Sequence, residues 1–402
     1  MSTSVLALKP HPLFTLPLAA LILTACAPVP DGEIDKAVSD IFAGRPGTLV
    51  ELKRESRKGI DTENLDLLPE IEEEEEEEED NSPSVVPDIA SMSGTVEFEL
   101  FNLQSGRYYR YAASRAELAR YSRARSRLPN ESDARGEPVS ADDLRREERQ
   151  QKSWSNATDN RTRRAIADGW SDTNSIYQRL ADYGGCSATV LSASSTRMIA
   201  ITAAHCIFTA GNNFSNSKLR PRRNGTTSPT WGSWTPYSFA YYSSFLDNDC
   251  EDNWKSRCIR RDIALVFASP DSGATPPQNM GWGYRPKSFL DDHTKYRRGY
   301  PGCSNSHSPS GCTTNNLYGD GAMSVGSFSK KSNGWHRQVR FSSDINPGDS
   351  GSGLYYYRNG FPYVFGVTSA EPSGCKTSCS SSRPNYGRLI TPDFFDFINS
   401  VM

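Results

Sequence analysis

Eight of the nine cysteines of this 402-residue chain lie after residue 185, and the ninth, Cys26, stands alone near the N-terminus. The sequence has no CxxC pair, and its few histidines do not fall at ligand spacing, so the pattern does not indicate a metal site. An even, clustered set instead predicts four disulfides and an oxidising compartment. Its members are Cys186, Cys206, Cys250, Cys258, Cys303, Cys312, Cys375 and Cys379. Eight cysteines allow 105 connectivities, and neighbours in sequence make the simplest pairs.

Charge divides the chain unevenly, although the formal net charge is only −3. That balance excludes a nucleic-acid binder driven by bulk positive charge, and 36% hydrophobic residues exclude a protein with many membrane spans. The range 61–106 holds no Lys or Arg, and Glu72–Glu79 is an unbroken acidic run. Residues 26–92 are therefore predicted to be an acidic, disordered tether, with a cation-binding or inhibitory strap as the alternative.

The N-terminal sequence predicts an export signal. An apolar stretch, Leu13–Leu23, follows Lys9 and is too short for a stable transmembrane helix. It ends in Leu23-Thr24-Ala25-Cys26, which resembles the lipobox of bacterial lipoproteins. The resemblance implies a signal peptide over residues 1–25 and a lipid on Cys26. It also implies an outer-membrane lipoprotein that is periplasmic, surface-exposed or released after processing. The alternative is an ordinary signal peptide with an incidental cysteine.

Residues 93–164 carry structural patterns but no chemistry. Val96, Phe98 and Leu100 alternate with glutamates, and a Gln-Ser-Gly turn at 104–106 leads into a tyrosine-rich run, which predicts a hairpin. Ser114 and Glu117 form a capping box for a helix over 115–127. A second helix is expected over 141–152. Both helices are mostly charged, so the region is predicted to be a small propeptide or a docking segment.

Two motifs place a polar side chain at the end of an apolar run, where burial requires a hydrogen-bonding partner. Ile201-Thr202-Ala203-Ala204-His205-Cys206 ends an apolar run, so His205 can be held rigidly as a neutral imidazole. Asp262 opens the apolar run 263–267, and burying a carboxylate there is costly without a partner. Each motif alone is also compatible with an ordinary core strand.

The third motif is Gly348-Asp349-Ser350-Gly351-Ser352-Gly353. Glycines on both sides of Ser350 permit a tight turn that presents the hydroxyl and leaves backbone N–H groups free. A base, an orienting acid and a nucleophile, in the order His, Asp, Ser, predict nucleophilic catalysis. Taken alone, this motif is also compatible with an ordinary glycine-rich turn that has no catalytic role.

Together, T-A-A-H-C and G-D-S-G resemble the chymotrypsin-like serine endopeptidases, from about Gly185 to the C-terminus. The resemblance implies a protease domain over 165–402, all-β, with two six-stranded Greek-key barrels and a C-terminal helix. It implies a catalytic triad of His205, Asp262 and Ser350, and an oxyanion hole from the N–H groups of Gly348 and Ser350. It also implies a Cys186–Cys206 disulfide, polypeptide substrates, and no cofactor or metal.

Departures from the family pattern bear on specificity. Ile345-Asn346-Pro347 stands where a cysteine normally braces the specificity pocket, and Ser352-Gly353 is closer to the bacterial glutamyl-endopeptidase branch. Asp344 lies six residues before Ser350, the spacing at which trypsins place their pocket carboxylate. With Ser369 and Glu371 as further substrate-binding residues, this predicts cleavage after Arg or Lys. The alternative is that Asp344 only satisfies N–H groups of its loop.

The resemblance also suggests a zymogen. Cleavage after Arg164 would create an N-terminal amine at Ala165, and in trypsins such an amine pairs with the aspartate before the nucleophile, here Asp349. Two other functions stay open. One is an inactive, protease-like binding module on the cell surface, and the other is a protease that processes only itself.

Overall fold

The computed structural model describes residues 38–52, 93–125, 175–209, 213–223, 231–248, 250, 256–302, 317–328, 337–342, 345, 347–370 and 385–402. The predicted signal peptide, Cys26 and the run Glu72–Glu79 lie outside these ranges. In the described part of the chain, no helix is long and apolar enough to cross a membrane.

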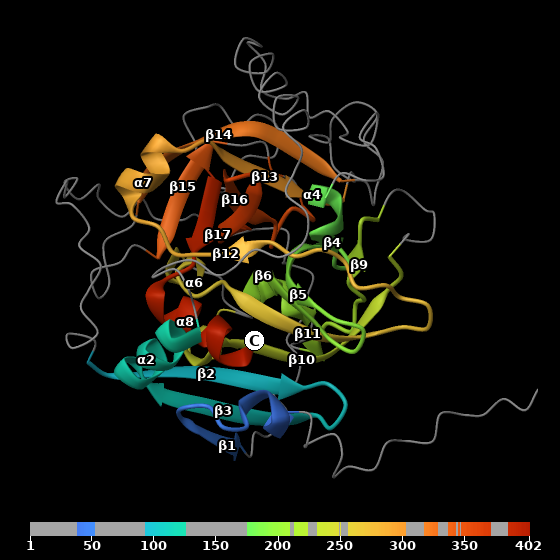
Figure 1. Cartoon of the computed structure of the whole chain (residues 1–402), viewed down its shortest axis with the longest axis vertical. Helices are drawn as coiled ribbons and strands as arrows, with labels where there is room; N and C mark the ends of the chain where they lie inside the picture. Colours follow the sequence, from blue (N-terminus) through green and yellow to red (C-terminus); the bar gives the residue numbers. More distant parts are fainter. Residues whose placement is uncertain are drawn as a thin grey trace, which may run out of the picture.

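The C-terminal part of the chain forms a seven-stranded, mostly antiparallel sheet (Figure 1). Its strands are β12 (Gly281–Trp282), β13 (Lys295–Gly299), β14 (Tyr318–Phe328), β15 (Gln338–Ser342), β16 (Gly353–Arg358), β17 (Phe361–Ala370) and β18 (Asn385–Leu389). The order is β12-β17-β16-β13-β14-β15-β18, and β17 also pairs with β18. These pairings make a closed circuit of six strands, β17-β16-β13-β14-β15-β18, with β12 attached outside it.

A nine-stranded sheet lies beside it, in the order β1-β3-β2-β10-β11-β6-β5-β4-β9. Its strands are β1 (Thr48–Leu52), β2 (Thr95–Asn102), β3 (Arg107–Ser114), β4 (Leu180–Asp182), β5 (Ser187–Ala193), β6 (Met198–Thr202), β9 (Arg220–Pro221), β10 (Trp234–Tyr242) and β11 (Ala264–Pro270). An isolated bridge from Leu219 to Trp234 links the β9 end back to β10, which closes a second circuit of six strands. A short hairpin, β7 (Phe208–Thr209) and β8 (Asn213–Phe214), stands apart.

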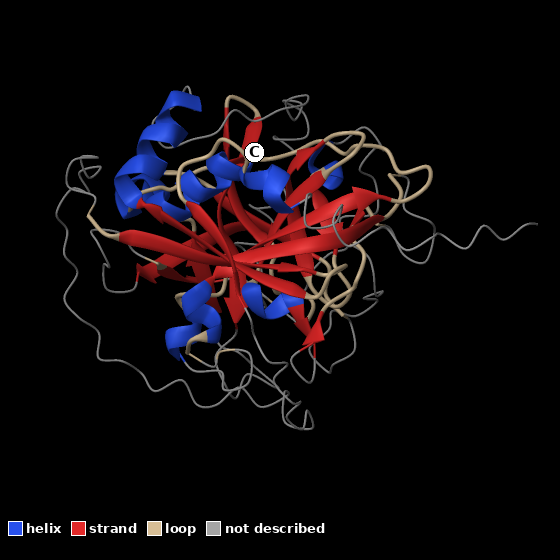
Figure 2. Ribbon diagram, turned by 90° about the horizontal axis from the view of Figure 1, so that it is seen from below, coloured by secondary structure: helices blue, strands red, loops and turns tan. Residues whose placement is uncertain are grey.

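Helices are short and lie at the periphery of the strands (Figure 2). They are α2 (Arg115–Arg125), α4 (Ser175–Gln178), η2 (Ala204–Ile207), α5 (Ser243–Leu246), α6 (Ser256–Ile259), α7 (Lys287–Asp292) and α8 (Pro392–Val401). In α8, Thr391 precedes a proline at the first turn, and Phe394, Phe397 and Ile398 are fully buried. The predicted all-β fold with a C-terminal helix is confirmed.

The structure differs from the sequence-based organisation at the N-terminal side of the chain. Residues 38–52, expected within the tether, form a helical turn and β1, and residues 95–125 form β2, β3 and α2. We call β1, β2, β3 and α2 the N-terminal layer. The hairpin and the Ser114–Glu117 capping box are present as predicted, with Ser114 Oγ 2.9 Å from Glu117 Oε2. The strands of this layer nevertheless belong to the nine-stranded sheet, because β2 pairs with β10.

Aromatic packing explains why this layer is not separate. The Phe98 ring stacks on Phe397 of α8 with centroids 3.7 Å apart, and Phe42 lies 4.6 Å from Tyr111. Asn399 of α8 donates to Ser122 of α2 over 2.6 Å. One buried cluster runs from these residues through α8 to side chains of β16 and β17. The inner face of α2 packs against α8, which its charged outer face did not reveal, and the helix expected over 141–152 lies outside the described residues.

Asp396 of α8 should give the α2–α8 contact a pH signature. Burial raises the pKa of this carboxyl from 3.8 to about 7, while a hydrogen bond from Ser122 opposes the shift. Folding then favours the protonated acid, so its contribution to stability is lost as pH rises from about 4 to about 7. Asp396→Asn should therefore stabilise the protein more at pH 8 than at pH 4, measured as urea midpoints. An equal difference at both pH values would contradict the assignment.

Candidate active site

His205 and Asp262 are brought together by the ends of two paired strands. β6 ends at Thr202 and leads into η2, which carries His205, while Asp262 lies just before β11. His205 Nδ1 is 2.8 Å from Asp262 Oδ2, and the His205 backbone N–H donates to Oδ1, also over 2.8 Å. Asp262 is fully buried, whereas the His205 side chain is 29% exposed. The aspartate thus holds the backbone of His205 through one oxygen and its ring through the other.

A third donor completes the surroundings of this carboxylate. Ser369, at the end of β17, donates its hydroxyl to Asp262 Oδ2 over 2.5 Å. A buried carboxylate is tolerated when several hydrogen bonds stabilise its charge. Ser369 was predicted from the sequence as a substrate-binding residue, which stays a prediction, and the structure places its hydroxyl on the carboxylate that holds His205.

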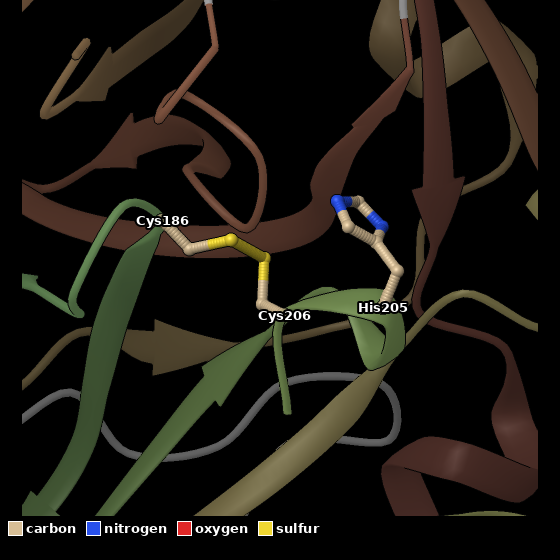
Figure 3. Close-up of side chains that lie close together, drawn as sticks. All are labelled: Cys186, His205 and Cys206. Atoms are coloured by element: carbon tan, nitrogen blue, oxygen red, sulfur yellow. A yellow bond between two sulfur atoms is a disulfide. The ribbon is translucent and has the colours of Figure 1, made fainter. Parts of the chain in front are cut away.

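The cysteine next to His205 is held in a disulfide that fixes η2. Cys186 and Cys206 form a disulfide with a Cα–Cα distance of 6.0 Å, and the His205 side chain lies beside it (Figure 3). Sulfur and ring-nitrogen atoms of these three residues lie within 4.8 Å of one another. The two sulfurs are bonded to each other, so they offer no thiolate to a metal. The disulfide therefore secures the backbone on which His205 sits.

The Ser350 turn depends on its two flanking glycines. Gly348 has φ +97° and Gly351 has φ +80°, in the left-handed region that favours glycine. A Cβ on Gly351 would lie 2.1 Å from Thr202 Oγ1, so this turn is seated against the end of β6. On its other side the Gly351 N–H donates to the Thr368 carbonyl over 2.8 Å. The turn therefore lies between the strand that leads to His205 and the strand that supplies Ser369.

Backbone donors accompany the serine. Within the described residues, the N–H groups of Gly348 and Ser350 donate to no carbonyl, whereas the N–H groups of Gly351 and Ser352 are both used. The carbonyls of the turn are held, because Ser187 donates its N–H to the Ser350 oxygen over 2.7 Å and its hydroxyl to the Gly348 oxygen over 2.8 Å. Two N–H groups on a fixed turn that donate to no carbonyl of the described residues can stabilise a developing oxyanion.

Asp349 has a partner that sequence reasoning missed. Its Oδ1 lies 2.9 Å from Arg297 Nη1, and both side chains are completely buried. Arg297 belongs to β13, where three of four successive residues are basic (Lys295-Tyr296-Arg297-Arg298). Several basic residues on a fully buried strand were the available signal, because a buried cation requires an acceptor. The expected amine of Ala165 lies outside the described residues, and Arg297 occupies the position beside Asp349.

Other predicted residues divide between described and undescribed segments. The Cys250–Cys258 pair is present, with Cα atoms 5.4 Å apart. Asp344 and Glu371, predicted to bind substrate, lie outside the described residues, and so do Cys303, Cys312, Cys375 and Cys379.

Replacing Ser369 should affect the reaction through Asp262. Ser369→Ala removes one hydrogen bond to a buried carboxylate, which contributes about 1.5–3 kcal/mol, so kcat should fall by about 10- to 100-fold with little change in KM. Ser369→Thr, which keeps a hydroxyl, should retain more activity than the alanine variant. Steady-state kinetics on a peptide ester would show this, and an unchanged kcat for Ser369→Ala would contradict it.

Comparison with known proteins gives similarities at the level of solved structures. No family model matches the chain, and no curated protein matches its sequence. A Glu endopeptidase solved in complex with MPD is 20% identical, with 59% of this chain and 95% of that chain covered and a TM-score of 0.39. The protease Anisep from Arthrobacter nicotinovorans is 16% identical, with 54% and 91% covered and a TM-score of 0.36. A thermostable serine protease, AL20, from an extremophilic microorganism is 13% identical, with 56% and 97% covered and a TM-score of 0.38. All three are similarities of fold.

Proposed function

We propose that the chain is a serine endopeptidase that hydrolyses peptide bonds through an acyl-enzyme. The observation that carries the proposal is the buried Asp262 carboxylate. It accepts a hydrogen bond from the His205 backbone N–H and lies 2.8 Å from the ring Nδ1. The Ser350 turn packs against the end of β6, the strand that leads to His205. A structural histidine needs no such arrangement, whereas a general base needs a fixed tautomer and an orienting acid.

The proposed roles follow from the chemistry of each group. His205 takes the proton of the Ser350 hydroxyl as that oxygen attacks the substrate carbonyl, and later gives it to the leaving amine. Asp262 keeps the proton on Nδ1 and stabilises the imidazolium. The N–H groups of Gly348 and Ser350 donate to the oxyanion of the tetrahedral intermediate. Water then hydrolyses the acyl-enzyme, with His205 again acting as the base.

Fluorophosphonate labelling tests this proposal. The wild-type protein should take up one phosphonyl group per chain, on Ser350, and should cleave a peptide library. Ser350→Ala should lose both the label and the cleavage. Ser194→Ala, which alters a serine on an exposed turn, should keep both and serves as the matched control. Absence of labelling in folded wild-type protein would favour the inactive binding module, and cleavage confined to the chain itself would favour a self-processing protease.

For specificity, we propose cleavage after Arg or Lys, supported by the position of Asp344 six residues before Ser350. A peptide panel that varies the residue before the scissile bond is the test. Cleavage limited to basic residues, and lost or reversed in Asp344→Ser, would support the proposal. Equal cleavage after apolar residues would refute it without affecting the proposed mechanism.

For location, we propose export to an oxidising compartment and a lipid anchor on Cys26. Two disulfides in the described residues support the compartment, because such bonds persist outside the reducing cytosol. Mass spectrometry of the mature N-terminus would detect the lipid, and Cys26→Ser should release the protein from the membrane fraction. A mature chain beginning elsewhere and without lipid would refute the anchor.

A further inference from the structure

We propose that this chain is active without proteolytic activation, because Arg297 supplies from within the fold the positive charge that orders the turn before Ser350. The inference rests on the proposed function and concerns how the same site is assembled. It replaces the zymogen expected from the sequence by a one-chain enzyme that keeps its N-terminal layer.

The contact between Arg297 and Asp349 is built into β13. Arg297 and Gly299 are two residues apart on this strand, so they face the same side. A Cβ on Gly299 would lie 2.7 Å from Asp349 Oδ1 and 2.3 Å from Ser352 Oγ. The Asp349 carboxylate therefore rests directly on the strand, with the guanidinium 2.9 Å away. Only glycine permits this approach.

The same strand end holds the rest of the turn. The Tyr300 N–H donates to Ser187 Oγ over 2.8 Å, and that hydroxyl donates in turn to the Gly348 carbonyl. The Gly302 N–H donates to the Pro347 carbonyl over 2.6 Å. The residues after β13 thus hold the two residues that precede Asp349, and no new chain end takes part in these contacts.

The charge of Arg297 makes a second cation unnecessary. A guanidinium remains protonated throughout the pH range of proteins, and it compensates the buried carboxylate permanently. An amine at Ala165 would have to share Asp349 with Arg297, which would bring two buried cations to one carboxylate. Such an arrangement is costly, because the uncompensated charge has no water around it. Within the described residues, Arg297 already compensates the charge of Asp349 in the uncut chain.

The N-terminal layer gives independent support. β2 pairs with β10 along residues Ser238–Tyr242, and Phe98 packs on α8. In the sheet order, β10 and β11 separate β2 from β6, the strand that leads to His205 (Figure 1). The layer therefore supports the fold at a distance from the site rather than covering it. Releasing it would expose the aromatic face of α8, which opposes its removal.

Labelling of the uncut chain is the first test. Full-length protein and an Arg163→Gln, Arg164→Gln variant are treated with fluorophosphonate, and the labelled species are weighed intact. The expected result is equal labelling of both, on a single chain that includes residues 38 to 402. Label found only on cleaved chains, and lost in the double variant, would overturn this inference and leave the proposed function standing. Absence of label on every form would overturn both.

The second test assigns the positioning role to Arg297. Arg297→Met should lower kcat by about 100-fold or more, the typical cost of losing one oxyanion-hole donor, with a smaller change in KM. Arg297→Lys should restore part of kcat because it keeps the charge. Arg298→Met is the matched control: it removes a neighbouring buried arginine of β13, which contacts the Tyr355 hydroxyl, and should lower stability while kcat is retained.

A double variant keeps this test decisive if the unpaired Asp349 prevents folding. Arg297→Met with Asp349→Asn removes both charges, so it should fold better than Arg297→Met alone and still show the loss of kcat. Wild-type kcat in either folded variant would overturn the positioning role.

Discussion

Ser350→Ala and His205→Ala are each expected to reduce kcat/KM by about 10⁴- to 10⁶-fold, and the double variant should be no worse than the poorer single variant. The groups act as a unit, because the hydroxyl without its base is a weak nucleophile and the base without the hydroxyl has no reaction to assist. Asp262→Asn should cost about 10⁴-fold, since the amide no longer holds the proton on Nδ1. The measurement is hydrolysis of an activated peptide ester by each purified variant.

Two controls separate chemistry from folding in this series. Circular dichroism and the urea midpoint should match the wild type for Ser350→Ala, whose side chain lies in a turn at the edge of the core. Asp262→Asn should be less stable, because the buried site loses the charge for which its donors are arranged. Losses that add up between Ser350→Ala and His205→Ala would contradict a common mechanism.

Phe98→Ala is expected to destabilise the whole protein by about 3–5 kcal/mol, the cost of removing a buried aromatic ring from a packed core. Phe98 is fully buried, lies on β2 and stacks on Phe397, so the cavity would open between the N-terminal layer and α8. Urea unfolding followed by tryptophan fluorescence would measure the change. A single, cooperative transition shifted to lower urea would show that the layer unfolds together with the rest.

The matched control is Val50→Ala on β1 of the same layer. Val50 is 56% exposed, so its truncation should change stability by no more than about 0.5 kcal/mol. If Phe98→Ala had an effect as small as Val50→Ala, the layer would be only loosely attached, and the proposal of a one-chain enzyme would lose its second support.

Local sequence patterns predicted the parts of the site that depend on local chemistry. An aspartate that opens an apolar strand and a histidine beside a cysteine were recognisable, because each places a polar group where burial demands a partner. The Cys186–Cys206 pairing came from the family resemblance. The hairpin at 95–114 followed from alternation, and the C-terminal helix, α8, followed from the family resemblance.

The missed features depend on contacts between distant parts of the chain. Nothing near Arg297 in the sequence points to Asp349, which lies 52 positions later, and the pair arises only when β13 and the Ser350 turn meet. The N-terminal layer was underestimated for a related reason. The face of α2 that holds Leu118 and Ser122 is narrow, and its burial depends on α8 at the opposite end of the chain. Short strands such as β1 gain their stability from neighbours rather than from their own composition.

The connection between β1 and β2 bears on the lipid anchor proposed for Cys26. β1 and β2 both pair with β3, so the 42 residues between them, with the run Glu72–Glu79, leave the sheet and return to it. They add nothing to the distance between a lipid on Cys26 and the folded unit. Eleven residues lie between Cys26 and Val38, where the described part of the chain begins, and a chain of that length spans at most about 40 Å. With the lipid anchor proposed for Cys26, the folded unit would begin within that distance of the bilayer.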